Sequence, residues 1–170
     1  MPTFDFDVAA FLRDPQLEGL ARVVLAGFVA VMVGLERELQ HKPAGARTYG
    51  LVAMGAALFT VGGIQAFGEG DPGARVAAQI VTGIGFLGAG TILHMRMHVV
   101  GLTTAAGLWA MAAIGMAIGG GLYILGVGVG IVLFLLLRFL RLDRLSGRGL
   151  ASDEIEERPG DDADENGAER

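Results

Sequence analysis

The chain has 170 residues, of which 52% are hydrophobic and 18% are charged, and its formal net charge is −5. A soluble domain carries about 25% charged residues, and here no Asp, Glu, Lys or Arg occurs from Gly101 to Leu137. This distribution excludes an ordinary soluble domain and predicts an all-α integral membrane protein. The absence of cysteine excludes a disulfide framework, a thiolate metal site and a cysteine nucleophile.

We predict a bundle of about five glycine- and alanine-rich transmembrane helices. As one helix, the uncharged stretch would be ~55 Å long at about 1.5 Å per residue, nearly twice the hydrocarbon core of roughly 30 Å. Three consecutive glycines, 119–121, divide it into two spans. The predicted spans cover residues 19–35, 48–67, 76–93, 102–118 and 122–140. Glu18 and Arg22 are spaced i, i+4 and are expected to pair near the headgroups.

The positions of Lys and Arg predict the orientation, because short cytoplasmic connections are enriched in these residues. With the N-terminus outside and the C-terminus inside, the outer side carries three basic residues, Arg13, Arg22 and Arg75. The inner side then carries eight: Arg37, Lys42, Arg47, Arg96, Arg138, Arg141, Arg144 and Arg148.

Three regions follow from this topology: an extracytoplasmic segment (1–18), a transmembrane domain (19–140) and a cytoplasmic tail (141–170). The tail begins with basic residues and holds nine acidic residues between Ser152 and Arg170. A segment of this composition buries too little apolar surface to fold. We expect it to be disordered, either simply solvated or serving as a docking segment.

Twenty-eight residues are glycine, more than twice the usual share of about 7%. Small residues let membrane helices approach each other closely, as in the pair Gly115 and Gly119. The third predicted span either packs on several sides or is locally broken, which would expose backbone groups to an ion or substrate. Glycines expected at helix contacts are Gly27 and Gly34 in the first span, and Gly83, Gly85, Gly88 and Gly90 in the third.

The first cytoplasmic connection, residues 34–48, concentrates charges of both signs at the membrane boundary. If the first helix continues past Leu35, Glu38 lies one turn beyond Gly34 and faces the bundle, whereas Glu36 points away. The connection is either a salt-bridged loop or a pocket that holds a ligand or an ion. The candidate binding residues are Glu36, Arg37, Glu38, Lys42, Arg47, Thr48, Gln79, Thr103 and Thr104.

Three other polar groups have structural as well as functional interpretations. Thr103 and Thr104 begin the fourth predicted span and either cap that helix or line the same pocket. Gln79 lies inside the third predicted span, where a single amide more often bonds a neighbouring helix than a substrate. His94 and His98 are i, i+4 partners if helical, but no Cys or well-placed Asp supplements them, and we expect no metal site.

Residues 83–88 spell the dinucleotide pattern G-x-G-x-x-G. No strand precedes the pattern, no acidic residue follows about 20 positions later, and it lies in a predicted span, so we reject it. No nucleophile and base, paired catalytic carboxylates or phosphate-cradling loop occurs in its proper context. We therefore expect no enzymatic activity, no cofactor and no nucleic-acid partner.

Several motifs, taken in order, resemble the MgtC/SapB family of bacterial membrane proteins. They are GLERE at 34–38, AGART at 44–48, LV at 51–52, GAALF at 55–59, RVAAQ at 75–79, GIGFLGAG at 83–90 and GLTTAA at 101–106, followed by Trp109. Tyr49 departs from many relatives, which have His after Arg-Thr. The soluble C-terminal domain of the longer members has no counterpart, so we expect a short form that ends in the acidic tail.

The resemblance implies a multi-pass protein of the bacterial inner membrane, linked in some members to adaptation to low magnesium and to survival in host cells. It also implies a membrane partner such as the ATP synthase. Our leading hypothesis is a membrane regulatory or binding protein that acts through a polar site at the cytoplasmic face. The alternative is a cation transporter or channel, which a homo-oligomer would form, because a monomer has few groups to replace the hydration shell of Mg²⁺.

Overall fold

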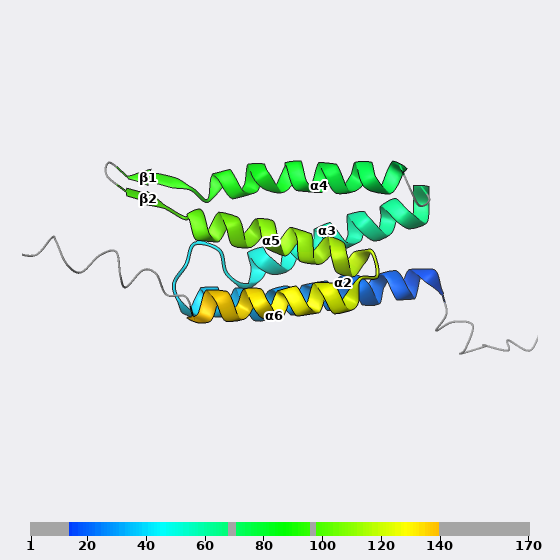
Figure 1. Ribbon diagram of the computed structural model, residues 1–170, viewed down its shortest axis with the longest axis horizontal. Helices are drawn as coiled ribbons and strands as arrows, with labels where there is room; N and C mark the ends of the chain where they lie inside the picture. Colours follow the sequence, from blue (N-terminus) through cyan, green and yellow to red (C-terminus); the bar gives the residue numbers. More distant parts are fainter. Residues whose placement is uncertain (1–13, 68–70, 96–97, 140–170) are drawn as a thin grey trace, which may run out of the picture. The chain divides into compact units, whose positions relative to one another are not determined.

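The computed structural model describes residues 14–67, 71–95 and 98–139, which form five α-helices and one short β-hairpin (Figure 1). In chain order the elements are α2 (Pro15–Leu39), α3 (Ala46–Phe67), α4 (Asp71–Gly90), β1 (Leu93–Met95), β2 (His98–Val100), α5 (Leu102–Gly119) and α6 (Tyr123–Phe139). The predicted acidic tail and most of the predicted N-terminal segment lie outside the described residues.

The predicted fold class, an all-α membrane protein with about five helices, is confirmed in its helices. By length and composition, α2, α3 and α5 are able to cross a membrane, and α6 is a shorter apolar helix. The helix α4 is not among these candidate spans, because Arg75 and Gln79 lower the mean hydropathy of its first half. The described residues thus hold three full-length apolar spans and one shorter one.

The first helix begins earlier than the predicted span. Asp14 caps it by accepting a hydrogen bond from the Gln16 amide at 2.8 Å. Pro15 occupies the first turn. Amides in the first turn have no acceptor within the helix, so the missing N–H of proline costs no hydrogen bond there. The cap extends α2 by one turn beyond the predicted start.

The same helix also ends later than predicted. His41 takes the left-handed conformation, with φ of 54°. The amides of His41 and Lys42 donate to the carbonyls of Glu38 and Arg37, respectively. These bonds satisfy carbonyls of the last turn that would otherwise lack partners. Glu36, Arg37 and Glu38 therefore belong to the helix, and the connection to α3 is short.

The hairpin corrects two predictions made for the third span. The prediction that this span continues to Leu93 is wrong, because α4 ends at Gly90 and β1 follows. The helical spacing assumed for His94 and His98 is also wrong, since in the antiparallel hairpin His94 pairs with Val99.

The two ends of the hairpin meet at Gly101, where the chain turns into α5. This glycine has φ of 96°, and a Cβ atom at this position would collide with the carbonyl oxygen of Thr91. Only glycine fits such a close approach in a left-handed conformation. The close contact brings the start of α5 back beside the end of α4 (Figure 1).

The helices α3 and α5 are central: α3 contacts α2, α4 and α5, and α5 contacts all four other helices. Against α5 the contact is backbone on backbone: a Cβ atom on Gly115 would collide with the carbonyl oxygen of Ala53, and one on Gly119 would lie 2.7 Å from that of Ala57. Both alanines are fully buried. This is the close approach at small residues that membrane bundles use.

The contact between α2 and α3 also depends on glycine. A Cβ atom on Gly27 would lie 2.8 Å from Cγ of Met54, and one on Gly34 would lie 2.6 Å from Cα of Ala46. Both glycines are buried. Both glycines therefore lie where α2 meets α3.

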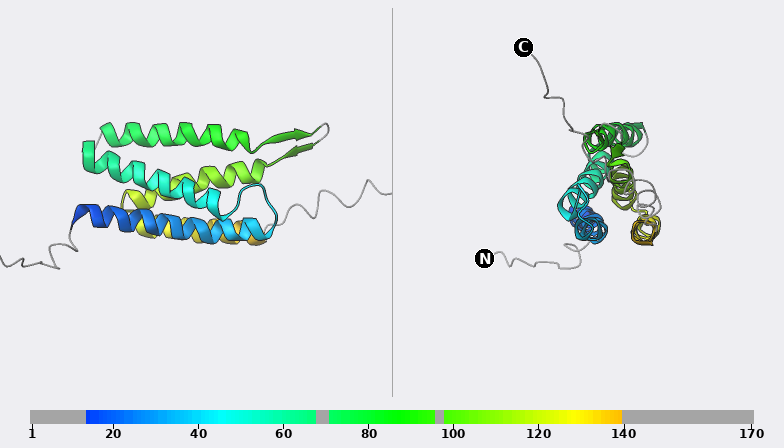
Figure 2. Two further views of the ribbon diagram at one scale, coloured as in Figure 1. Left: turned by 180° about the vertical axis from the view of Figure 1, so that it is seen from behind. Right: turned by 90° about the vertical axis from the view of Figure 1, so that its left-hand side faces the viewer.

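The helix α4 is peripheral: viewed end on, it lies over α3 and α5 (Figure 2). It is continuous rather than broken. Nothing lies within 4 Å of a Cβ atom built on Gly83, Gly85 or Gly90, whereas one on Gly88 would lie 3.7 Å from Cβ of Ala105. Within one chain, only Gly88 of these four meets a neighbouring helix, because α4 has neighbours on one side only.

Candidate functional site

Polar side chains converge at one end of the bundle, where α2 and α6 end and α3 and α5 begin (Figure 1). Three polar or charged residues are buried in the described part of the chain: Glu36, Arg37 and Thr104. All three lie at this end. We define the buried polar cluster as these residues together with Tyr49 and Arg138, which touch it.

The carboxylate of Glu36 is buried, with 5% of its side chain exposed. One oxygen accepts a hydrogen bond from the Gln40 amide nitrogen. The other faces Arg138 of α6, whose guanidinium donates at 3.3 Å while 51% of its side chain is exposed. Glu36 therefore joins the last turns of two helices that are distant in sequence.

Arg37 and Tyr49 are buried more deeply, with 3% and 0% of their surfaces exposed. The Arg37 guanidinium interacts electrostatically with the Tyr49 phenol. Neither the Nε atom of Arg37 nor the hydroxyl of Tyr49 has a hydrogen-bond partner of acceptable geometry among the described residues. Buried polar groups almost always have such partners, so these two atoms mark an unusual site.

The helix α5 forms one wall of the cluster. The hydroxyl of Tyr49 points at Gly107, where a Cβ atom would collide with it. Thr104 precedes Gly107 by three positions, so both lie on the same face of α5, and Thr104 is buried. Thr103 is exposed, so only one of the two threonines faces the cluster.

The rest of the first connection is at the surface. Arg47 and Thr48 are exposed, and Lys42 is half-buried. Glu38 is also exposed, and its carboxylate accepts a hydrogen bond from the Ala46 amide at 3.1 Å, which caps the first turn of α3. These side chains do not enter the buried cluster.

The prediction of which glutamate faces the bundle is wrong. The sequence predicted that Glu38 faces the bundle and that Glu36 points away, but Glu36 is buried and Glu38 is exposed. The reason is α6, whose last turn packs against the side of α2 that carries Glu36. Spacing within α2 alone does not indicate where α6 lies.

Gln79 lies apart from the cluster, in a groove between α3 and α4 that Arg75 also lines. Tyr49 and Arg138 belong to the cluster but were not among the predicted site residues. A signal for Tyr49 was present: it is spaced i, i+4, i+8 with Ala53 and Ala57, the small-residue face of α3.

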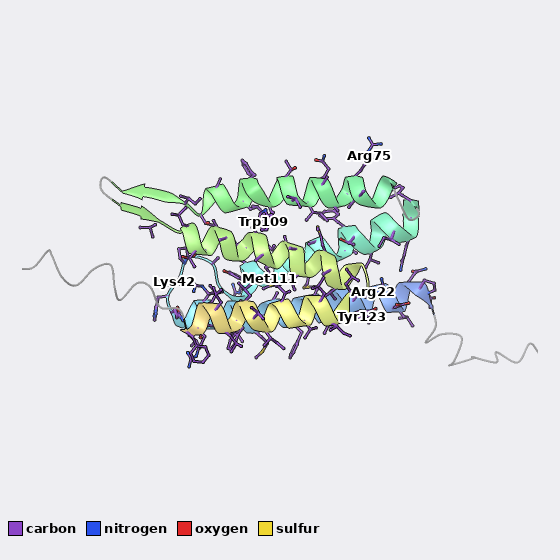
Figure 3. The ribbon with its side chains drawn as sticks, viewed as in Figure 1. Arg22, Lys42, Arg75, Trp109, Met111 and Tyr123 are labelled. Carbon is purple, nitrogen blue, oxygen red and sulfur yellow. The ribbon has the colours of Figure 1, made fainter. Side chains whose placement is uncertain are left out.

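The opposite end of the bundle holds a second polar group, centred on Arg22 (Figure 3). Its guanidinium donates to the carbonyl of Gly119 at 2.9 Å and to the Glu18 carboxylate at 2.5 Å. It also lies 5.7 Å from the centre of the Tyr123 ring. The predicted pair of Glu18 and Arg22 is confirmed. Through its contacts with Gly119 and Tyr123, Arg22 also stabilises the turn between α5 and α6.

No group of three or more His, Cys, Asp or Glu side chains in the described residues is arranged to hold a metal ion. The buried cluster instead combines one carboxylate, two guanidinium groups, a phenol and a hydroxyl. Such donors and acceptors bind and orient a polar group, or couple helices through hydrogen bonds.

The helices and this buried polar cluster define a polytopic membrane protein with a charged site at one end of its bundle. The family model described as MgtC family matches residues 23–144. The chain belongs to the MgtC family.

Several curated proteins are similar. YhiD of Escherichia coli K12, named "Putative magnesium transporter", is 45% identical over 117 residues, which is 65% of this chain and 54% of YhiD. SrpB of Synechococcus elongatus is 42% identical over 151 residues, 80% of this chain and 83% of SrpB. The MgtC protein of Brucella abortus is 53% identical over 91 residues, 54% of this chain and 38% of that protein.

The chain thus spans about half the length of YhiD and less of the Brucella protein. No solved structure matches the chain.

Proposed function

We propose that this chain is a membrane regulatory or binding protein of the bacterial inner membrane, which acts in adaptation to low magnesium or to stress through the buried polar cluster. The observation that carries the proposal is Arg37. Its guanidinium is buried, and among the described residues no ion pair joins it to a carboxylate. A buried charge without an opposite partner is costly.

Buried polar atoms without hydrogen-bond partners are rare in native proteins, so a site that holds two of them is a candidate for function. Here the Arg37 guanidinium and the Tyr49 hydroxyl interact with each other in one cluster, but neither the Nε of Arg37 nor the hydroxyl completes a well-formed hydrogen bond with a described residue. Both atoms are donors that a ligand or a partner protein would satisfy. The link to magnesium is supported by the name of the relative YhiD.

In the orientation inferred from Lys and Arg, the cluster lies at the cytoplasmic face. A ligand or a membrane partner would then reach it from the cell interior or from a neighbouring protein. The family resemblance suggests the ATP synthase as one such partner. Affinity purification of the intact protein from membranes, with and without the Arg37→Gln change, tests whether a partner depends on the cluster.

The test of the function is a growth experiment in limiting magnesium, in a bacterium that lacks its own MgtC-family protein. We expect the parent chain to restore growth and Arg37→Gln and Tyr49→Phe to lose most of this activity while they still insert in the membrane. Gly85→Ala is the control, because Gly85 is exposed and its Cβ would meet open space. Full activity in both cluster variants would contradict the proposal.

The second candidate function is a cation transporter or channel formed by an oligomer. It is favoured by the name of YhiD. Against it, the described residues hold no cluster of metal ligands, and Mg²⁺ sheds its water reluctantly. Purified protein in liposomes under an imposed gradient separates the two functions. Saturable uptake of Mg²⁺ would favour transport, and no flux above protein-free liposomes would favour regulation or binding.

A further inference from the structure

A groove of about 690 Å³ runs along the outside of the bundle between α3 and α4, with Ala112 of α5 at its base. It lies away from the buried polar cluster and has no part in the proposed function. One wall is a stripe of α4 with helical spacing: Arg75, Gln79, Gly83 and Leu87. Its volume lies within the range of about 300–1,000 Å³ found for sites that bind small molecules.

The groove is open because small residues line it. Gly55 of α3 and Gly83 of α4 both face it, and nothing lies within 4 Å of a Cβ atom built on either one. Larger apolar side chains, including Phe59 and Leu87, stand exposed along its length. The result is a groove lined mainly by apolar side chains and glycines.

The groove is polar only at the end where α4 begins. Arg75 lies in the second turn of α4 at the rim of the groove, and its side chain points outward from the bundle (Figure 3). No hydrogen bond or ion pair joins its guanidinium to another described residue. Gln79, one turn further along, is also exposed to the groove. Beyond Gln79 the α4 wall is apolar.

The length of the groove matches one leaflet of a bilayer. From Arg75 to Leu87 the α4 wall is ~18 Å long at about 1.5 Å per residue. Half of the hydrocarbon core is roughly 15 Å. With Arg75 at the depth of the headgroups, the remainder of the groove spans the depth of the acyl chains.

We propose that this groove binds one phospholipid with an anionic headgroup. The Arg75 guanidinium binds the phosphate, Gln79 hydrogen-bonds the polar region beneath it, and one acyl chain lies over Gly83 and Gly55. The charge of Arg75 complements an anionic lipid, and guanidinium groups bind phosphate through paired hydrogen bonds.

The first test fills the groove. Gly83→Leu places a side chain in the open space, whereas Gly85→Leu adds the same side chain to the same helix at a position that does not line the groove. After extensive delipidation in detergent, native mass spectrometry should find one phosphatidylglycerol on the parent chain and on Gly85→Leu. We expect at least tenfold less on Gly83→Leu. Circular dichroism checks that the three proteins have the same helix content.

The second test removes the charge. With phosphatidylglycerol and phosphatidylcholine added in equal amounts, the parent chain and Arg75→Lys should retain the anionic lipid preferentially. Arg75→Gln should lose that preference at least threefold and still bind either lipid.

Three outcomes would overturn the proposal. Equal lipid retention by the parent chain and Gly83→Leu would show that the groove binds no lipid. If Arg75→Gln keeps the preference for the anionic lipid, Arg75 does not bind the headgroup. A dimer present in the parent chain and absent from Gly83→Leu, with equal lipid on both, would assign the groove to a second copy of the chain.

Discussion

At Glu36 and Arg138, one ion pair joins a buried group to a half-exposed one, so the two partners are not equivalent. Replacing Arg138 by Gln leaves the Glu36 carboxylate buried without its cation. We expect this change to lower the free energy of unfolding by about 1–3 kcal/mol, the cost of an unsatisfied buried group. Replacing Glu36 by Gln leaves a guanidinium that water already reaches, and we expect a loss below about 1 kcal/mol.

Denaturant unfolding in detergent micelles, followed by circular dichroism, measures both changes. The double variant Glu36→Gln, Arg138→Gln should be more stable than Arg138→Gln alone, because it no longer buries a Glu36 carboxylate that has lost its cation. A larger loss for Glu36→Gln than for Arg138→Gln would contradict the burial assigned to this pair.

At the residue scale, the sequence predicts the neighbourhood of the candidate site but not its interior. The charges of residues 34–48 placed Glu36, Arg37 and Glu38 at one end of the bundle. Which of them is buried depends on α6, since Arg138 lies 102 positions beyond Glu36. Tyr49 was interpreted as a departure from a family pattern, and only its burial against Arg37 and Gly107 makes it part of the cluster. Contacts between distant helices decide both points.

At the scale of the helices, glycine decides which elements touch. The backbone of α5 lies against α3 at Gly115, where a Cβ atom would meet the Ala53 carbonyl. Gly115→Ala should therefore force the helices apart and lower the free energy of unfolding by about 1–3 kcal/mol, as overpacking does. Gly62→Ala in α3 is the control, because its Cβ meets open space. It should raise stability by about 0.5–1 kcal/mol through helix propensity.

Thermal and denaturant unfolding of the two variants, measured beside the parent chain, checks this prediction. If the two glycine substitutions change the free energy of unfolding equally, the backbones of α3 and α5 do not approach each other as closely as the structure shows.

The helices themselves were predictable from the sequence, because long apolar segments separated by polar or glycine-rich turns have few other structures in a bilayer. The hairpin was not predictable. Its strands have three residues each, too few to show an alternating pattern. Nor could spacing distinguish Gly88, which meets α5, from Gly83, Gly85 and Gly90, which face open space. That difference depends on how many neighbours α4 has.

At the scale of the whole molecule, the fold makes a prediction about topology that the chain is well suited to test. The sequence has no cysteine, so single cysteines introduced at exposed positions are unique labels. Pro43→Cys and Val100→Cys, at the end of the bundle that holds the buried cluster, should react only with a thiol reagent that reaches the cytoplasm. Phe67→Cys, at the other end, should react from outside the cell.

Labelling of whole cells with a membrane-impermeant maleimide, compared with labelling of inverted vesicles, gives the answer. If Val100→Cys and Phe67→Cys react from the same side, α4 does not cross the membrane. If Pro43→Cys reacts from outside, the orientation inferred from Lys and Arg is reversed.

The peripheral position of α4 also affects how the protein is made. The ribosome synthesises α4 after α3 and before α5, yet α3 and α5 pack directly on each other, and α4 rests on both. The surface on which α4 packs is incomplete until α5 has entered the membrane. Until α5 is inserted, α4 can pack against α3 alone. The order in which the helices pack therefore differs from the order in which they are translated.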